Sequence, residues 1–507
     1  MSDLPEPTSW WQRAVVYQIY PRSFAAGQQG SGVGDLEGIT EHLDHVAWLG
    51  ADAIWLSPVF RSPMADFGYD VSDFCDVDPL FGTLADLDRL VAEAHDRGIK
   101  VLLDWVPNHT SEQHPWFVES RSSRTNPKAD WYVWRDEPPN NWVAAFPPGE
   151  RAWHWDEARG QWYLRTFAHQ QPDLNWDVPE VEAAMHDTLR FWLDRGIDGF
   201  RMDVVHLIGK DIGRDDPAEA VARGGPHVPY NDIEVTHDRL RRIRAVLDEY
   251  PGERTSVGEV YLLDEEAIAR YYGAGDELHM SFNFPFLWTR AEASSLRRRI
   301  MRTLEHLAPV GAWPTWVLSN HDVPRHRQRH GGDERVARIM CLVLLTLPGT
   351  PFLYQGEELG LVDADVPPDR QVDPGGRDGC RAPIPWSAEP LHGWPAEPWL
   401  PFPPESDVRN VATMRDDPAS ILHLYRDAVA LRRDQDDLIG GRLEPLDLGG
   451  SVLAHRRGDG WLVVANFGDT AVELPEAAEV ALSSCRTLDG ATVRSVPTLT
   501  ALVARTA

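Results

Sequence analysis

Charged side chains recur at the carboxyl ends of buried, strand-like segments in this chain of 507 residues. The segments that begin at Lys100, Gly199, Thr255 and Trp316 end in these polar residues: Asp104, Asn108, His109, Arg201, Asp203, His206, Glu259, His321 and Asp322. A carboxylate buried in a strand destabilises the fold unless it is paired or functional. Structural ion pairs that hold loops are one interpretation, but carboxylates at the same end of four segments favour a reactive site.

Several carboxylates that converge with arginine and histidine suit the cleavage of a glycosidic bond. In that reaction one carboxylic acid protonates the leaving oxygen, while a second carboxylate attacks or stabilises an oxocarbenium-like carbon. Metal-assisted hydrolysis is the competing use, but the histidines form neither HExxH nor HxH spacing, which does not favour a zinc site. The chain also lacks the GxSxG turn of serine hydrolases and the GxxxxGKS/T loop that cradles phosphates.

Short apolar runs alternate with segments of helical period along the chain. The eight runs begin at Ala14, Ala53, Lys100, Gly199, Thr255, Met280, Trp316 and Thr350, and the amphipathic segments span 36–49, 84–97, 181–195, 238–250, 296–307 and 334–345. This alternation predicts an α/β protein with a (β/α)8 barrel. In such a barrel the carboxyl ends of the strands share one face, so the polar residues should meet there.

Two long connections interrupt the pattern. About ninety residues separate the third and fourth runs, and nine of the 21 tryptophans lie between Trp105 and Trp176. We therefore predict an inserted domain at 105–176 within a catalytic barrel made of 1–104 and 177–436. Residues 361–404, rich in Pro, Gly and Asp, are either a structured loop on the catalytic face or a surface connection. Short alternating strands from about Arg442 predict an antiparallel β-sandwich domain at 437–507.

Composition limits the possible partners and location. Lys and Arg number 49 against 79 Asp and Glu, a net charge of −30 that repels nucleic acid and anionic membranes. The segment MSDLPEPTSWW does not resemble a secretory signal, no apolar stretch is long enough to span a bilayer, and the four cysteines are far apart. We expect reduced thiols, a cytoplasmic location and no membrane or nucleic-acid partner.

Several of these segments resemble the motifs of a known family. DWVPNHT at 104–110, GFRMDVVH at 199–206, GEVY at 258–261 and SNHD at 319–322 resemble, in order and spacing, the four main motifs of glycoside hydrolase family 13, the α-amylase superfamily. QPDLNW at 171–176 resembles the fifth motif in the form typical of the oligo-1,6-glucosidase and α-glucosidase branch. The resemblance extends from Trp10 to about Arg433 and implies the same barrel.

The resemblance implies roles for three acids. Asp203 is expected to be the nucleophile that forms a β-glucosyl-enzyme ester, and Glu259 the acid that protonates the glycosidic oxygen and then the base that activates water. Asp322 is expected to grip sugar hydroxyls more tightly in the transition state. Arg201 belongs to the substrate-binding set and should favour the ionised form of Asp203, while Glu259 should stay protonated near neutral pH. Such a pair retains anomeric configuration, with a carboxyl separation of roughly 5 to 5.5 Å.

Further residues are expected, by the same resemblance, to bind the terminal glucose of an oligosaccharide substrate. Asp66 binds its outer hydroxyls, and the Tyr69 ring stacks beneath it. Arg381 is expected to join Asp66 and close the pocket behind the non-reducing end. His109 and His321 are expected to donate hydrogen bonds to hydroxyls of the same sugar. A pocket closed at one end accepts only chain termini, which implies exo-action.

The sequence departs from its relatives at two places. Relatives in this branch often carry an Asp-x-Asn-x-Asp calcium loop after the first strand, but the equivalent stretch GQQGSGVGD, residues 27–35, keeps only Asp35. One oxygen ligand is too few for calcium, so we expect no calcium requirement, no other metal and no cofactor. Val204 follows the nucleophile, as in relatives that prefer α-1,6 linkages, but Val205-His206 is not their usual context, so we favour α-1,4 linkages.

The sequence therefore predicts a retaining exo-α-glucosidase that releases glucose from maltose and short oligosaccharides, with transglycosylation when sugar is abundant. An oligo-1,6-glucosidase, and a glucosyl transferase of the sucrose isomerase or trehalose synthase type, are alternatives among enzymes. A non-catalytic partner, like the family-resembling heavy chains of amino-acid transporters, is the alternative outside enzymes. Such partners need a membrane anchor and tolerate loss of the acids, and neither property fits this sequence.

Overall fold

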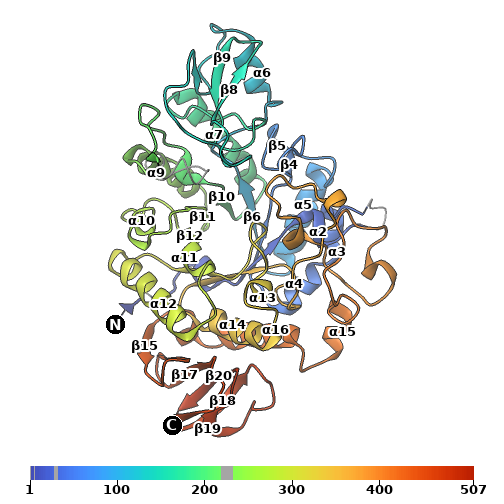
Figure 1. Ribbon diagram of the computed structural model, residues 1–507, viewed down its shortest axis with the longest axis vertical. Coiled ribbons are helices and arrows are strands. Elements are labelled where there is room, and N and C mark those ends of the chain that lie inside the picture. Colours follow the sequence, from blue (N-terminus) through green and yellow to red (C-terminus); the bar gives the residue numbers. More distant parts are fainter. Residues whose placement is uncertain (1, 5, 28–31, 219–231, 507) are drawn as a thin grey trace.

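The computed structural model describes residues 2–4, 6–27, 32–218 and 232–506 (Figure 1). Its centre is a sheet of eight parallel strands in the order β12-β11-β10-β6-β3-β2-β14-β13. These strands are β2 (Val16–Ile19), β3 (Ala53–Leu56), β6 (Lys100–Trp105), β10 (Gly199–Met202), β11 (Thr255–Gly258), β12 (Met280–Ser281), β13 (Thr315–Val317) and β14 (Thr350–Tyr354). Each predicted apolar run overlaps one of them, so the predicted α/β barrel is confirmed.

The sheet is nearly closed into a barrel. Its edge strands are β12 and β13, and the Thr315 hydroxyl donates across the seam to the Ser281 carbonyl oxygen at 2.6 Å. At the start of β10 a Cβ on Gly199 would lie 2.3 Å from the Thr255 carbonyl oxygen, so glycine lets β10 and β11 approach closely. These neighbouring strands lead directly into Asp203 and Glu259.

Helices cover the outside of the barrel. The main ones are α3 (Leu36–Glu41), α4 (Leu43–Leu49), α5 (Leu84–Asp96), α7 (Pro179–Asp194), α9 (Glu234–Asp248), α12 (Ala293–Leu307), α14 (Glu334–Thr346) and α16 (Ile421–Arg433). The helix predicted at 36–49 is divided at His42. In a continuous helix the His42 amide would donate to the Gly38 carbonyl oxygen. Here the ring Nδ1 of His42 lies 2.8 Å from that oxygen, and the His42 amide donates to the carbonyl oxygens of Ile39 and Thr40 instead.

Shorter elements connect the barrel units. They are α1 (Trp10–Arg13), α2 (Pro21–Phe24), β4 (Phe60–Arg61), β5 (Asp73–Val77), α10 (Glu265–Arg270), α11 (Phe284–Leu287), α13 (His326–Arg329), α15 (Val411–Asp416) and α17 (Asp436–Ile439). The loops after β3, β6, β10, β11, β13 and β14 carry the site described below.

The segment after β6 projects from the barrel at the top of Figure 1. It contains α6 (Pro115–Ser122) and a three-stranded antiparallel sheet in the order β7-β9-β8, formed by β7 (Trp134–Arg135), β8 (Trp153–Asp156) and β9 (Gln161–Leu164). Trp142 and Trp153 pack in its small apolar core, and Trp155, 38% exposed, is the most exposed of the nine tryptophans from Trp105 to Trp176. The tryptophan surplus is therefore mostly structural. The domain limits at 105 and 176 stay predictions.

The end of the chain forms one antiparallel sheet, at the bottom of Figure 1. It has seven strands in the order β1-β15-β16-β17-β20-β18-β19, formed by β1 (Ser2–Asp3), β15 (Arg442–Leu446), β16 (Val452–Arg457), β17 (Trp461–Asn466), β18 (Val472–Ser483), β19 (Thr492–Val496) and β20 (Thr500–Thr506). Alternate residues of β17 face two apolar clusters: Val463 packs toward the barrel, and Leu462 packs within the terminal sheet. The antiparallel β-structure is confirmed, whereas the sandwich arrangement and the limits 437–507 stay predictions.

Among the residues that the structure describes, no helix is both long and apolar enough to cross a membrane.

Candidate active site

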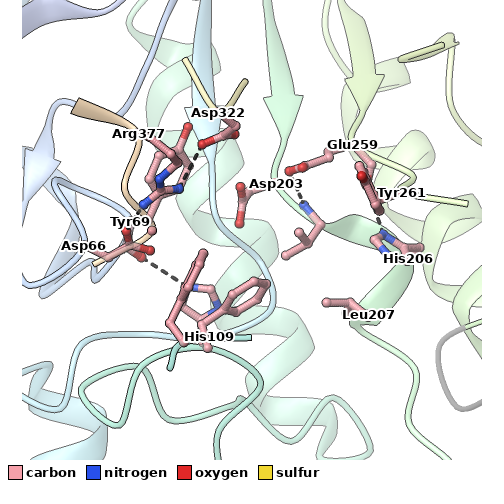
Figure 2. Close-up of a pocket in the computed structure, with 14 residues that line it drawn as sticks. Asp66, Tyr69, His109, Asp203, His206, Leu207, Glu259, Tyr261, Asp322 and Arg377 are labelled. Carbon is pink, nitrogen blue, oxygen red and sulfur yellow. Dashed lines mark hydrogen bonds and ion pairs between the residues drawn. The ribbon is translucent and has the colours of Figure 1, made fainter. Parts of the chain in front are cut away.

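A pocket of about 360 Å³ opens at the carboxyl ends of the barrel strands (Figure 2). Its wall consists of Asp66, Tyr69, His109, Phe146, Phe167, Asp203, Val204, His206, Leu207, Glu259, Tyr261, Asp322, Gly375 and Arg377. Six of the nine predicted site residues are therefore on one wall: Asp66, Tyr69, His109, Asp203, Glu259 and Asp322. The other three, Arg201, His321 and Arg381, are buried directly behind it.

The sheet ladder positions the two acids at the pocket floor. The Asp203 amide donates to the Trp105 carbonyl oxygen at 2.8 Å, and the Glu259 amide donates to the Met202 carbonyl oxygen at 2.9 Å. Both residues thus continue the hydrogen bonding of β6, β10 and β11 beyond the strand ends. Their side chains project from a rigid part of the barrel, which is the arrangement that precise chemistry needs.

One guanidinium group binds three carboxylates at this floor. Arg201, 2% exposed, donates through Nη1 to Asp104 Oδ1 at 2.7 Å and to Asp203 Oδ1 at 2.6 Å. Its Nη2 donates to Glu259 Oε2, which also accepts from the Val204 amide at 3.2 Å. No residue within the described ranges donates a hydrogen bond to Asp203 Oδ2 or Glu259 Oε1. Each acid therefore has one oxygen held by protein and one left for a substrate.

Backbone strain contributes to this geometry at Val204. Its φ of 34° and ψ of 39° put a β-branched residue in the left-handed region, which costs about 1 to 3 kcal/mol. The strained turn aims the Val204 amide at Glu259 and turns the chain sharply after the nucleophile candidate Asp203. The following 3-10 turn, η1 (Val205–Leu207), brings His206 and Leu207 to the pocket wall.

The pKa of Asp203 differs from the sequence-based expectation. Burial raises the pKa of Asp203 well above its ordinary value; Arg201 acts in the opposite direction, while Glu259 and Asp104 add to the rise. Burial also raises the pKa of Asp104 to about 6, against the pull of Arg201. As expected, Arg201 lowers the pKa of Asp203 and so favours its ionised form. The combined effect of burial, Glu259 and Asp104 is larger, so the pKa of Asp203 is raised. The single charge of Arg201 therefore does not offset the burial of Asp203 and its two neighbouring carboxyl groups.

This balance predicts a pH effect for the Asp104→Asn substitution. A nucleophilic Asp203, as the sequence predicts, must be ionised to react, so we expect kcat/KM to fall as the pH drops through the raised pKa of this residue. Removing the charge of Asp104 takes away one cause of that rise and leaves Arg201 more available to Asp203. The acid limb of the pH profile should therefore move to lower pH. Profiles of kcat/KM for both proteins test this, with the exposed Asp211→Asn as control; an unmoved or higher limb contradicts it.

A hydrogen-bonded chain supports the Tyr69 ring from behind. The Tyr69 hydroxyl lies 3.0 Å from Asp104 Oδ2 and 2.6 Å from His321 Nε2, and the two rings stack at 5.5 Å. Gln18 Nε2 lies 2.7 Å from His321 Nδ1. Burial lowers the pKa of His321 to about 3, so the ring is neutral. His321 is fully buried and its ring nitrogens already have these partners, so in this structure it positions Tyr69, and direct contact with sugar stays a prediction.

Arg377 closes the pocket, in place of the predicted Arg381. The Arg377 Nη2 donates to Asp66 Oδ1 at 2.8 Å and its Nη1 donates to Asp322 Oδ1 at 2.9 Å, so this one side chain joins both walls (Figure 2). Arg381 donates to Asp322 Oδ1 at 3.1 Å and to the His321 carbonyl oxygen at 2.8 Å, but it forms no hydrogen bond or ion pair with Asp66. Asp373 holds both guanidinium groups, at 2.7 and 3.2 Å. The loop at 361–404 therefore lies on the catalytic face.

Asp322 is ionised because of these neighbours. Burial acts to raise the pKa of its carboxyl group. His321 acts in the opposite direction only when its ring is protonated, but Arg377 and Arg381 are charged throughout and also hold the pKa well below its usual range. Asp322 therefore stays a carboxylate at neutral pH, which suits the predicted role of accepting hydrogen bonds from sugar hydroxyls.

His109 completes the polar side of the pocket. Its Nε2 lies 3.2 Å from the Tyr69 carbonyl oxygen, and burial lowers its pKa to about 4, so the ring is neutral. Gln171, from the QPDLNW segment, donates to Asp66 Oδ2 at 3.1 Å. Sequence reasoning noted this segment but gave Gln171 no role; it also missed Phe146 and Phe167, whose only signal was the aromatic richness of 105–176.

The inserted segment is tied to the barrel by a buried ammonium group. Lys210 Nζ donates to Asn108 Oδ1 and to the Leu207 carbonyl oxygen, both at 2.6 Å, and pairs with Asp173 Oδ2 at 3.1 Å. Asn108 follows β6, Leu207 follows β10, and Asp173 belongs to the inserted segment. The Lys210 ammonium group therefore links these three parts of the chain beneath the site. Its role is to position the loops.

The described residues contain no group of three or more His, Cys, Asp and Glu side chains that could hold a metal ion. Asp35, the residue left from the relatives' calcium loop, accepts from the backbone amides of Gly27 and Gly38 and caps α3. Residues 28–31 of that stretch lie outside the described residues. The expected independence from calcium stays a prediction.

A barrel with carboxyl groups after strands β10, β11 and β13, gathered at one pocket, has the architecture of a glycoside hydrolase. The family model for the α-amylase catalytic domain matches residues 18–441. The chain belongs to this α-amylase family, glycoside hydrolase family 13, and to its α-glucosidase branch.

The sequences of similar proteins match this chain over nearly its whole length. A probable α-glucosidase of Rhizobium meliloti is 45% identical over 495 residues, which cover 90% of this chain and 89% of that protein. An oligo-1,6-glucosidase of Heyndrickxia coagulans is 38% identical, with 87% and 88% covered. The crystal structure of the α-glucosyl transfer enzyme XgtA is 40% identical with a TM-score of 0.90, and the match covers 98% of this chain and 100% of that one.

Proposed function

We propose that this glycoside hydrolase is a retaining, exo-acting α-glucosidase that releases glucose from the non-reducing ends of maltose and short α-1,4-linked oligosaccharides. The observation that carries the proposal is the placement of Asp203 and Glu259 on the two amino nitrogens of Arg201, at the floor of one pocket. The bridge from Asp66 through Arg377 to Asp322 supports exo-action, because it blocks one end of that pocket.

The first half of the reaction uses the two free oxygens. Asp203 Oδ2 attacks the anomeric carbon, the bond to the glycosidic oxygen breaks, and the carboxyl proton of Glu259 passes to that oxygen. The product is a β-glucosyl ester of Asp203 and a free sugar. Because one oxygen of each acid is held by Arg201, the two side chains need little reorganisation during this step.

The second half returns the enzyme to its starting state. Glu259, now a carboxylate, takes a proton from water, and the water oxygen attacks the anomeric carbon from the side that the leaving sugar vacated. The ester bond breaks and its electrons return to Asp203. Two inversions give retained α-configuration. The cationic pair Arg377 and Arg381 behind Asp322 keeps that carboxylate ionised, so that it can hold sugar hydroxyls through both steps.

Two related activities compete with this proposal. The similarity to an oligo-1,6-glucosidase and the presence of Val204 after Asp203 support α-1,6 linkages. The similarity to an α-glucosyl transfer enzyme supports transfer of glucose to a second sugar, including isomerisation, through the same ester. Both alternatives share the first half-reaction, so they differ only in the leaving group and in what attacks Asp203-bound glucose.

A substrate panel separates these activities. Equal concentrations of maltose, isomaltose, sucrose, trehalose and maltotriose are incubated with the protein, and the products are identified by chromatography. We expect glucose to be the main product, with maltose and maltotriose cleaved faster than isomaltose. A strong preference for isomaltose would support an oligo-1,6-glucosidase instead, and rearranged disaccharides from sucrose or maltose would support the isomerase class. Release of internal fragments from maltooligosaccharides would contradict exo-action.

We also propose that the enzyme works in the cytoplasm on a small oligosaccharide, with no nucleic-acid partner, no metal and no cofactor. All four cysteines carry free thiols, which supports a reducing location. The net charge of −30 supports the absence of a nucleic-acid partner.

A further inference from the structure

The closed end of the active-site pocket depends on one arginine that reaches two carboxylates at once. The Arg377 guanidinium group donates to Asp66 Oδ1 at 2.8 Å and to Asp322 Oδ1 at 2.9 Å (Figure 2). A guanidinium group is planar and its N–H groups point in fixed directions, so the two contacts together require one orientation of the group. The residues that set this orientation therefore decide the shape of the closed end.

Asp373 holds the guanidinium group from behind. Its Oδ1 accepts from Arg377 Nη2 at 2.7 Å, and its Oδ2 accepts from Arg377 Nε at 2.8 Å and from the Arg377 amide at 2.7 Å. Contact through both oxygens fixes the plane of the guanidinium group. Burial acts to raise the pKa of Asp373, but hydrogen bonds from Arg377 and the charge of Arg381 outweigh it and lower the pKa, so the group is a carboxylate at neutral pH.

Asp373 and Arg377 are both supported by further residues. Asp378, which is 2% exposed, accepts at Oδ2 from the Val372 amide at 2.9 Å and from the Asp373 amide at 3.2 Å. The Phe146 ring of the inserted segment lies 5.2 Å from Arg377 Cζ in a cation–π contact. Arg377 is thus held by the loop after β14 and by the inserted segment together.

Gly375 leaves the space that this arrangement needs. Gly375 lies on the pocket wall, and its φ is outside the left-handed region, so alanine would fit the backbone there. A Cβ at this position would lie 2.8 Å from Arg377 Nε and 3.1 Å from Asp373 Oδ2. Because the arginine side chain is flexible, it is the group that would move. The missing side chain at Gly375 is therefore a condition for the observed position of Arg377.

From these contacts we propose that Asp373 is a positioning residue and Gly375 a specificity-determining position, and that both act through Arg377 to make the closed end select for the C4 hydroxyl group of the terminal glucose. The inference rests on the proposed function, because it uses the same bound glucose.

The C4 hydroxyl group is the part of the sugar that meets this end. C1 of the bound glucose lies at Asp203 when the ester forms, and C4 is the ring atom opposite C1. The C4 hydroxyl group therefore points to the end that Asp66 and Arg377 occupy (Figure 2). A polar site that is held in place rejects a sugar without the matching hydroxyl, because the polar groups of the site are then left unpaired.

Inhibition by two simple sugars tests this selection. Glucose or 4-deoxyglucose is added during hydrolysis of 4-nitrophenyl α-glucoside, and the inhibition constant of each sugar is measured. For the wild-type protein we expect the constant of 4-deoxyglucose to be about tenfold higher than that of glucose. In Asp373→Asn, which keeps one acceptor oxygen in place of two, the ratio should fall to about twofold, because the constant for glucose rises while that for 4-deoxyglucose changes little.

A second variant reaches Arg377 from the pocket side. Gly375→Ala leaves every charge in place and should lower the ratio in the same way, which keeps the test open if Asp373→Asn does not fold. Asp369→Asn, an exposed acid of the same loop, and Gly450→Ala, where a Cβ would meet no atom within 4 Å, are the matched controls and should keep the wild-type ratio. Thermal unfolding of each variant shows whether the fold is retained.

The outcomes distinguish this inference from the proposed function. Equal constants for the two sugars in the wild-type protein would overturn the inference while leaving the glucosidase intact. A rise of both constants alike in the folded variants, or an unchanged ratio, would show that Asp373 and Gly375 serve the fold alone. A wild-type protein that hydrolyses neither maltose nor 4-nitrophenyl α-glucoside would overturn the proposed function and the inference with it.

Discussion

Replacing Asp203 by asparagine is expected to lower kcat for maltose by about 10⁴-fold or more, equivalent to at least about 5.4 kcal/mol of lost transition-state stabilisation. An amide cannot form the glucosyl ester, and it also removes the charge that stabilises the oxocarbenium-like carbon. The fold should remain, because asparagine keeps the size of the side chain and its carbonyl oxygen can still accept from Arg201 Nη1.

The measurement is steady-state kinetics together with circular dichroism and the thermal midpoint of unfolding. Asp211→Asn, an exposed acid eight residues further along the chain, is the matched control and should keep wild-type activity. Activity of Asp203→Asn within about 100-fold of wild type, in a protein with unchanged unfolding, would show that another group forms the intermediate.

Replacing Glu259 by glutamine is expected to lower kcat for maltose by about 10² to 10⁴-fold, the range that a positioned general acid and base contributes. The loss should be smaller for the first step with 4-nitrophenyl α-glucoside, because its leaving group departs without a proton. Glutamine still places an oxygen near Arg201 and the Val204 amide, so the floor of the pocket should keep its geometry.

Azide distinguishes a lost acid–base from a damaged site. It needs no general base, so it should attack the glucosyl ester in Glu259→Gln and restore turnover of the activated substrate, giving α-glucosyl azide. Glu266→Gln, an exposed glutamate of α10, should show neither the loss nor the azide effect. An equal loss for maltose and for the activated substrate, without rescue, would contradict the role of Glu259.

Much of the barrel could be predicted because its strands are buried on both faces. All four residues of β2, β3, β10 and β11 are buried, and such strands appear in the sequence as apolar runs bounded by turn residues. β1 shows the opposite case. It has two residues, Ser2 and Asp3, and pairs with Leu443 and Arg442, more than 430 positions away, so no local pattern could reveal it.

The site residues at strand ends could be placed from the sequence because the barrel itself carries Asp203, Glu259 and Asp322 to one rim. Loop residues could not be placed in this way. Arg377 and Arg381 are four residues apart in a segment without periodicity, and only the folded loop decides that Arg377 reaches Asp66. The raised pKa of Asp203 could not be predicted from the sequence either, because it depends on burial and on the distances to three charged neighbours.

The most direct test of the central claim is to trap the glucosyl ester on Asp203. The protein is incubated with 5-fluoro-α-glucosyl fluoride, a substrate whose fluorine slows breakdown of the ester, then digested with pepsin at low pH and analysed by mass spectrometry. A peptide that contains Asp203 should gain the mass of one fluoroglucosyl group, and fragmentation should place that mass on Asp203. Labelling of a different side chain, or an unlabelled protein that turns the reagent over to the β-anomer of the sugar, would contradict the account.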